Sequence, residues 1–167
     1  MSDWLRTVIG IVLFKAGPQD LPGSRSSLVL AVLVYATVAL TVSMATGSTA
    51  GYSPMLLSFG LQLVLIVAVL QFNHRMVRFN QTASALFATA ALLSLVNLPL
   101  WLLAEPPLPS NLAVLILAGL FWSLAVDGSI WRHALDRSFG FGLAIAVLLF
   151  VINFAIMQSV TPAANSA

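Results

Sequence analysis

The sequence contains no cysteine and very few charged residues. Without cysteine there is no disulfide, no thiolate nucleophile and no thiolate-bound metal. Asp, Glu, Lys and Arg make up 7% of the 167 residues and hydrophobic residues make up 60%, whereas a soluble domain carries about a quarter charged residues. This balance suits a lipid environment, so we predict an integral membrane protein. The net charge is only +2, and no basic stripe indicates a nucleic-acid partner.

Motifs of common catalytic sites are also missing. The sequence has no Gly-x-Ser-x-Gly elbow, no His-Glu-x-x-His metal motif and no phosphate-binding loop. Its two histidines, His74 and His133, lie outside the long apolar runs, and each has a neighbouring arginine that disfavours a metal cation. We therefore expect a protein without enzymatic activity, cofactor or metal.

Five long apolar runs occupy most of the chain. At 1.5 Å per helical residue, each run is long enough to cross a hydrocarbon core of about 30 Å. We predict an all-α protein in which residues 27–158 form a five-helix transmembrane domain, between a cytoplasmic segment at 1–26 and an extracytoplasmic tail at 159–167. The predicted spans are 27–46, 54–72, 82–104, 111–131 and 139–158.

The basic residues are confined to alternate gaps. They precede the first run or lie in the second and fourth gaps, and the other gaps and the tail contain none. Because cytoplasmic loops retain Lys and Arg, this asymmetry places the N-terminus in the cytoplasm and the C-terminus in the periplasm. Nearly all are arginine, which indicates a GC-rich genome and hence a bacterial inner membrane. The basic residues are Arg6, Lys15, Arg25, Arg75, Arg78, Arg132 and Arg137.

Residues 2–15 are expected to form a separate amphipathic helix. The charged residues Asp3 and Arg6 lie on one side, and apolar residues such as Val8 lie on another. The helix could lie along the cytoplasmic headgroup plane or could pack as an arm against the bundle, and the sequence leaves both positions open. The prolines and glycines of 17–23 then turn the chain towards the first span.

Four polar side chains stand out inside the predicted spans, where each needs a partner. They are Gln62, Asn97, Asp127 and Asn153. Gln62 and Asn153 can bridge helices through amide hydrogen bonds. Asn97 lies just before Pro99, which removes a helical hydrogen bond, so this segment forms either a static bend, the favoured interpretation, or a kink that lines a cavity.

Asp127 is the one acidic residue inside a predicted span. It can serve as a proton or cation site whose pKa is modulated by Arg75, Arg78 or Arg132, or it can form an ion pair at the membrane boundary. The ion pair is the favoured interpretation because Asp127 lies about one helical turn from the cytoplasmic surface. Carriers instead place ionisable sites near the midplane.

Small residues form stripes on two spans, and such stripes let membrane helices approach closely. The contact is expected within one chain by default, although it could also join two chains. The stripe residues are Ser84, Ala88, Ala91 and Ser94 in the third span, and Gly142 and Ala146 in the fifth. A second candidate interface consists of arginines that could face anionic lipid or an acidic partner, namely Arg75, Arg78, Arg132 and Arg137.

The layout of five spans, a cytoplasmic N-terminus and very short outer loops resembles the Yip1-type membrane proteins. The resemblance covers residues 27–158 as topology. The Asp-Leu-Tyr-Gly-Pro-type segment of the eukaryotic members is missing, and Gln19-Asp20-Leu21-Pro22 is no more than a remnant of it, so no functional residue carries over. The resemblance implies a non-enzymatic protein that binds other membrane proteins and shapes membrane.

Two functions are consistent with these features. We expect an accessory or scaffold subunit that contacts membrane lipid and either other membrane proteins or further copies of itself. The alternative is a transporter or channel component with a polar pathway that involves Gln62, Asn97 and Asp127. The alternative requires these side chains to converge on one water-accessible cavity.

Overall fold

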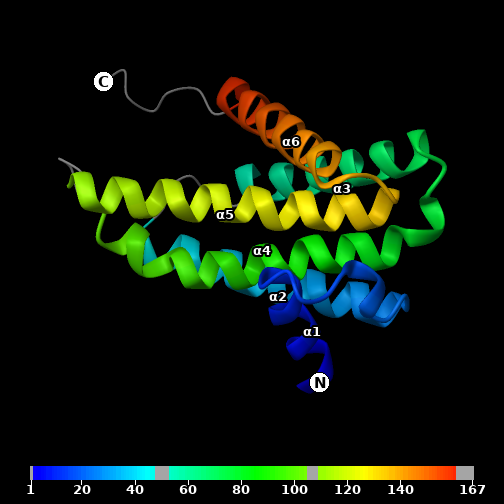
Figure 1. Cartoon of the computed structure of the whole chain (residues 1–167). Coiled ribbons are helices and arrows are strands. Elements are labelled where there is room, and N and C mark those ends of the chain that lie inside the picture. Colours follow the sequence, from blue (N-terminus) through cyan, green and yellow to red (C-terminus); the bar gives the residue numbers. More distant parts are fainter. Residues whose placement is uncertain (1, 48–52, 105–108, 161–167) are drawn as a thin grey trace.

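The computed structural model describes residues 2–47, 53–104 and 109–160 (Figure 1). These residues form helices and turns, with no strand among them. Five of the helices are long and apolar enough to cross a membrane, which confirms the prediction of an all-α chain with five such helices. The elements are α1 (Ser2–Val12), η1 (Pro18–Asp20), α2 (Arg25–Ala45), α3 (Ser53–Phe72), η2 (Met76–Arg78), α4 (Phe79–Leu102), α5 (Ser110–Leu135) and α6 (Phe139–Val160), where η marks a short 3-10 helix.

Some helices extend beyond the apolar runs. Helix α4 begins at Phe79, before the predicted start at residue 82, and α5 continues past residue 131 to Leu135. Helical hydrogen bonds join backbone groups and do not require apolar side chains, so polar flanking residues can prolong a helix. The apolar run therefore predicts where a helix crosses the membrane better than where it ends.

Helices α1, α3 and α5 are each followed by a left-handed residue that is not glycine. Phe14, His74 and Asp136 have φ angles of 58°, 55° and 51°. After α1, the Lys15 N–H donates to the Gly10 carbonyl at 2.7 Å, as in a Schellman motif. The predicted helix at 2–15 is therefore shorter than expected. A left-handed residue with a side chain costs about 1–2 kcal/mol, so contacts elsewhere must stabilise these chain reversals.

Helix α4 lies at the centre of the bundle. It contacts α1, α2, α3 and α5, and residues 82–89 in its first half are all buried. Most of these residues are small, which allows neighbouring helices to approach from several sides. The large exception is Phe87, whose ring lies 5.3 Å from the ring of Tyr35 and 5.1 Å from that of Phe59.

The loops gather at the two ends of the bundle (Figure 1). One end contains the start of α2, the loop with η2 and the turn between α5 and α6, and we call it the basic end. Fully buried side chains lie mostly towards this end, among them Ile66 and Leu70 of α3 and Val126 and Trp131 of α5. Its basic residues are Arg25, Arg75, Arg78, Arg132 and Arg137.

Helix α1 packs one side against the bundle. Val8 and Ile11 are buried, α1 contacts α4 and α5, and the Trp4 indole N–H donates to the Ser27 hydroxyl at 3.2 Å. On the other side of the helix, Leu5 is half exposed. The contacts expected of a packing arm are therefore present, and an apolar surface remains uncovered.

Candidate functional site

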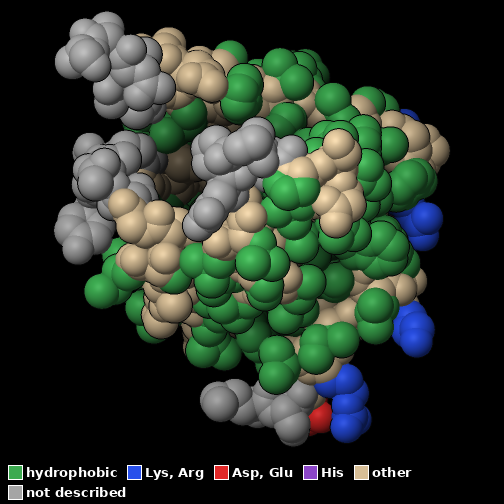
Figure 2. Space-filling view, turned by 90° about the vertical axis from the view of Figure 1, so that its left-hand side faces the viewer, with side chains coloured by type: hydrophobic (Ala, Val, Ile, Leu, Met, Phe, Trp, Pro, Cys, Tyr) green, Lys and Arg blue, Asp and Glu red, His purple; other side chains and the backbone are tan. Residues whose placement is uncertain are grey.

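A cavity of about 700 Å³ lies between the five long helices. Its lining extends from Tyr35 of α2 to Phe154 of α6. Towards the basic end it reaches Ile66 and Trp131, which are buried in the core. Figure 2 views the opposite end of the bundle and shows a hollow in that face. The core therefore closes the cavity towards the basic end, and the hollow lies at the opposite end.

All four polar residues singled out in the sequence line this cavity. Gln62 comes from α3, Asn97 from α4, Asp127 from α5 and Asn153 from α6. The interpretation as a polar pathway required Gln62, Asn97 and Asp127 to converge, and they do so here. Asn153, which was expected first of all to bridge helices, joins them.

The polar side chains lie at different depths. Asn97 lies against Gly119 of α5, where an added Cβ atom would come within 2.7 Å of the Asn97 amide oxygen. Asp127 is about 12 Å further along α5 towards the basic end, at 1.5 Å per residue. Helix α6 meets α5 at Gly128 and rises about 15 Å from there to Asn153. The two asparagines therefore form an outer level, and Asp127 lies at an inner level.

Asp127 belongs to a stripe of α5 that faces the cavity. Leu120, Ser123 and Trp131 share this stripe, because positions three or four apart lie on one face of a helix. The Ser123 hydroxyl donates to the Gly119 carbonyl at 2.9 Å, so it is satisfied within its own helix. The carboxylate of Asp127 is the strongly polar group that this stripe presents to the cavity.

No cation pairs with Asp127 among the residues that the structure describes. Arg75 and Arg78, two of the arginines expected to act on Asp127, instead bind Asp136 at 3.1 Å and 2.8 Å. Arg132 is exposed, and its guanidinium lies 3.4 Å from the His133 ring. The predicted ion pair of Asp127 at the membrane boundary is therefore absent from the described part of the chain.

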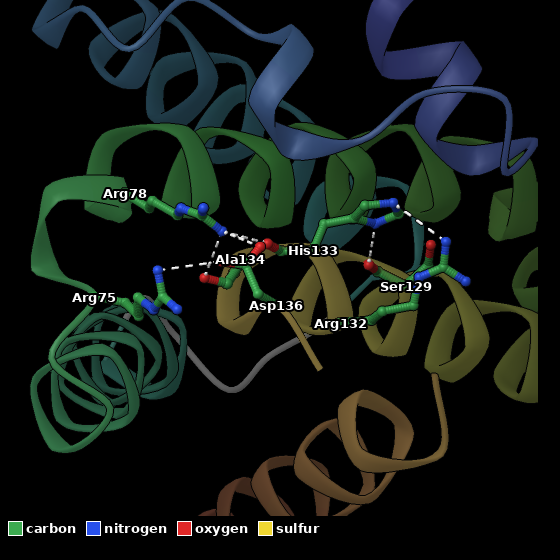
Figure 3. A network of polar contacts seen from close by, with 7 residues as sticks. All are labelled: Arg75, Arg78, Ser129, Arg132, His133, Ala134 and Asp136. Carbon is green, nitrogen blue, oxygen red and sulfur yellow. Dashed lines mark hydrogen bonds and ion pairs between the residues drawn. The ribbon is translucent and has the colours of Figure 1, made fainter. Parts of the chain in front are cut away.

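Asp136 joins two loops at the basic end (Figure 3). The Arg78 guanidinium donates to the Asp136 carboxylate at 2.8 Å and to the carbonyl oxygens of His133 and Ala134 at 2.7 Å and 3.2 Å. Arg78 thereby binds the negative end of the α5 dipole. Its hydrogen bond and charge, with the charge of Arg75, lower the pKa of Asp136 below its usual range. Sequence reasoning missed Asp136, although it is the sole acid in the fourth gap.

The Asp136→Asn variant tests this network through its pH dependence. Since the pKa of Asp136 is lowered on folding, its stabilising effect is complete above the unfolded pKa of about 3.9 and is lost as pH falls through the folded pKa. We expect the wild type to melt about 2–4 °C above the variant at pH 7, as for exposed ion pairs. Asparagine tolerates the left-handed backbone, so the charge is the main change.

Melting in detergent, followed by light scattering from pH 7 to pH 3, measures this difference. It should shrink below about pH 4, where the Asp136 carboxylate of the unfolded chain begins to take up a proton, and it should be lost as pH falls through the lower folded pKa. A difference that stays the same at pH 3 would mean that the Asp136 charge does not stabilise the loops.

The small-residue stripes pack inside the chain. The Gly142 backbone lies so close to the Gly128 carbonyl oxygen that an added Cβ atom would overlap it. Helices α5 and α6 therefore make their closest contact here, and these residues are not available to a partner. The other stripe residues that are buried within the bundle are Ser84, Ala88, Ala91 and Ala146.

The four arginines of the candidate interface divide into two pairs. Arg75 and Arg78 are engaged by Asp136. Arg132 and Arg137 are exposed, and the Arg137 guanidinium lies 6.0 Å from the centre of the Phe141 ring. The second pair is presented outward to lipid headgroups or to another protein without an acidic partner in the described part of the chain, whereas Arg75 and Arg78 are partly exposed beside Asp136.

No family model, no curated protein and no solved structure matches this chain. Function is therefore inferred from the cavity, its lining side chains and the loops at its closed end.

Proposed function

We propose that this chain is a non-enzymatic component of a membrane transporter or channel and that it binds a small molecule in the cavity between its helices. The main support is that Gln62, Asn97, Asp127 and Asn153 reach one cavity from four helices. Polar side chains are costly inside a membrane, and those that face a cavity commonly mark a substrate or ion path. A volume of about 700 Å³ suits a drug-sized molecule.

The cavity offers binding groups in order of depth. A molecule that enters from the end opposite the basic end first meets the amides of Asn97 and Asn153, which donate and accept hydrogen bonds. It then reaches the Asp127 carboxylate, close to the wall that includes the buried Trp131. Release at the basic end would require the helices around Trp131 to separate. Such one-sided access is what alternating access requires of each conformation.

We further propose that the basic end faces the cytoplasm of a bacterial inner membrane, with the N-terminus cytoplasmic and the C-terminus periplasmic. The support is the confinement of Lys and Arg to alternate gaps. Helix α1 then serves as an amphipathic helix near the cytoplasmic headgroups, with Val8 against the bundle and the exposed Leu5 towards lipid. In this orientation the cavity opens to the periplasm.

An accessory or scaffold subunit is the second candidate, as the Yip1-like topology implies. The exposed Arg132 and Arg137 favour it, because they could bind an acidic partner or anionic lipid. The small-residue stripes add no support, since they pack within the chain. A stoichiometric protein partner, found by native mass spectrometry of the chain in nanodiscs, would favour this candidate over transport.

Single cysteines test the proposed pathway directly, because the chain contains no cysteine of its own. Asp127→Cys and Ser123→Cys place a thiol in the cavity. Ala118→Cys is the matched control, since Ala118 is exposed on another side of the same helix. The thiolate is the nucleophile that attacks a methanethiosulfonate reagent, and ionisation of a thiol requires water rather than lipid.

The labelling uses a membrane-impermeant methanethiosulfonate on intact spheroplasts, which expose the periplasmic face. We expect both cavity cysteines to react and Ala118→Cys to remain unmodified. If the cavity cysteines are as unreactive as Ala118→Cys from either side of the membrane, the cavity is not a polar pathway and the proposed function is wrong. Reaction from the cytoplasmic face alone would reverse the proposed orientation.

A further inference from the structure

The charge in the cavity comes from a single side chain. Among the described residues that line it, Asp127 is the sole charged one, and no Lys, Arg or His is present. The nearby cations are engaged elsewhere or exposed, as shown above for Arg75, Arg78 and Arg132. A carboxylate away from bulk water needs a positive partner or hydrogen-bond donors. The described part of the chain supplies no such partner for the Asp127 carboxylate, so a bound ligand can supply the positive charge.

The wall beside Asp127 is aromatic. Trp131 lies one helical turn further along α5 and lines the same cavity, so its ring and the carboxylate share one face of the helix. Trp101 and Phe150 also contribute to the lining. Aromatic faces attract organic cations, and tryptophan does so most strongly. An anionic group and aromatic rings therefore occur together in one cavity.

A bare metal ion does not suit these groups. Calcium and transition metals take four or more ligands within about 2.6 Å, and the Asn97 amide lies about 12 Å from the level of Asp127. The described residues contain no group of three His, Cys, Asp or Glu side chains that could hold a metal. A cation with its own apolar substituents, in contrast, can use the whole volume.

We propose that the cavity selects an amphipathic organic cation, whose charged centre lies between the Asp127 carboxylate and the Trp131 ring and whose apolar groups contact the surrounding helices. The inference rests on the proposed function and specifies its ligand class. A soluble amine and the ammonium headgroup of phosphatidylethanolamine share this chemistry, so both are sources of such a ligand.

Two probes of the same shape and opposite charge test the inference. Tetraphenylphosphonium and tetraphenylborate are titrated against the wild-type chain in phosphatidylglycerol nanodiscs, with empty nanodiscs subtracted. We expect the phosphonium to bind at least about tenfold more tightly than the borate. Asp127→Asn should remove this preference, whereas Asp136→Asn makes the same chemical change outside the cavity and should retain it.

The outcomes distinguish a failure of the proposed ligand class from a failure of the proposed function. Equal binding of the two probes, or no binding of either, overturns the inference, while cysteine labelling of the cavity still decides whether a pathway exists. If Asp127→Asn does not purify as a monodisperse protein, Asp127→Glu replaces it. That variant keeps the charge and must keep the cation preference, and a loss of preference in it would also count against the inference.

The source of the ligand is decided by lipid composition. Nanodiscs that contain phosphatidylethanolamine are compared with nanodiscs of phosphatidylglycerol alone. Competition of phosphatidylethanolamine with tetraphenylphosphonium supports a lipid headgroup as the cation, and unchanged phosphonium binding supports a soluble amine. Both results agree with an organic cation at Asp127.

Discussion

Replacing Gly142 with alanine is expected to destabilise the bundle by about 1–3 kcal/mol, although it adds one methyl group. A Cβ atom at this position would overlap the Gly128 carbonyl oxygen and lie 2.6 Å from the Arg132 backbone nitrogen. Both obstacles are backbone atoms of α5, which a rotamer change cannot move. Helices α5 and α6 must therefore separate at the closed end of the cavity, where they contact most closely.

Gly140→Ala is the matched control, because Gly140 lies in the same helix and nothing lies within 4 Å of a Cβ atom added there. Alanine is favoured over glycine in a helix by about 0.8–1 kcal/mol, so this variant should be neutral or more stable. Retention of the folded peak in size-exclusion chromatography after heating measures both variants. Equal melting of Gly142→Ala and the wild type would show that α5 and α6 do not depend on this contact.

The membrane helices could be predicted from the sequence because lipid imposes a simple rule. Each span must be apolar over its whole length, and every backbone polar group must be satisfied within it. The runs at 27–46 and 139–158 therefore match α2 and α6 closely. The helix ends matched less well, since the left-handed residue Phe14 ends α1 early and nothing in its side chain indicates that conformation.

The residues of the candidate site could be predicted from the sequence, but their arrangement around one cavity could not. Depth along a span follows from sequence position, so Asp127 could be placed about one helical turn from the membrane boundary. The direction that each side chain faces depends on how helices rotate about their axes, and a helix that is apolar all round gives no such signal. The structure was therefore needed to show that all of these side chains face the same cavity.

The ion pair of Asp127 was predicted wrongly for a related reason. Asp127, Asp136 and several arginines lie near the same membrane boundary, and proximity in sequence does not decide which acid binds which arginine. Asp136 lies in a turn next to the loop of Arg75 and Arg78, so it binds both without leaving water. Asp127 faces the cavity instead. Pairing an exposed acid costs less desolvation than pairing one inside the bundle.

Replacing Ala90 with tryptophan is expected to block the inner level of the cavity. Ala90 lines the cavity and lies about 10 Å from Asn97 towards the basic end, at 1.5 Å per residue. Asp127 lies about 12 Å from Gly119, the neighbour of Asn97, in the same direction. Side chains lean towards the N-terminus of their helix, which for α4 is the basic end, so the indole should cover Asp127.

The block is measured in the Asp127→Cys background, where Ala90→Trp should slow labelling by more than about tenfold. Ala118→Trp adds the same side chain to an exposed position of α5 and should leave labelling unchanged. Unaltered labelling with Ala90→Trp would mean that water reaches Asp127 by another route. In the chain that retains Asp127, a steric block should exclude tetraphenylphosphonium and tetraphenylborate alike, whereas Asp127→Asn removes the preference between them. Ala90→Trp therefore tests whether binding depends on the space in the cavity, and Asp127→Asn tests whether it depends on the charge of the ligand.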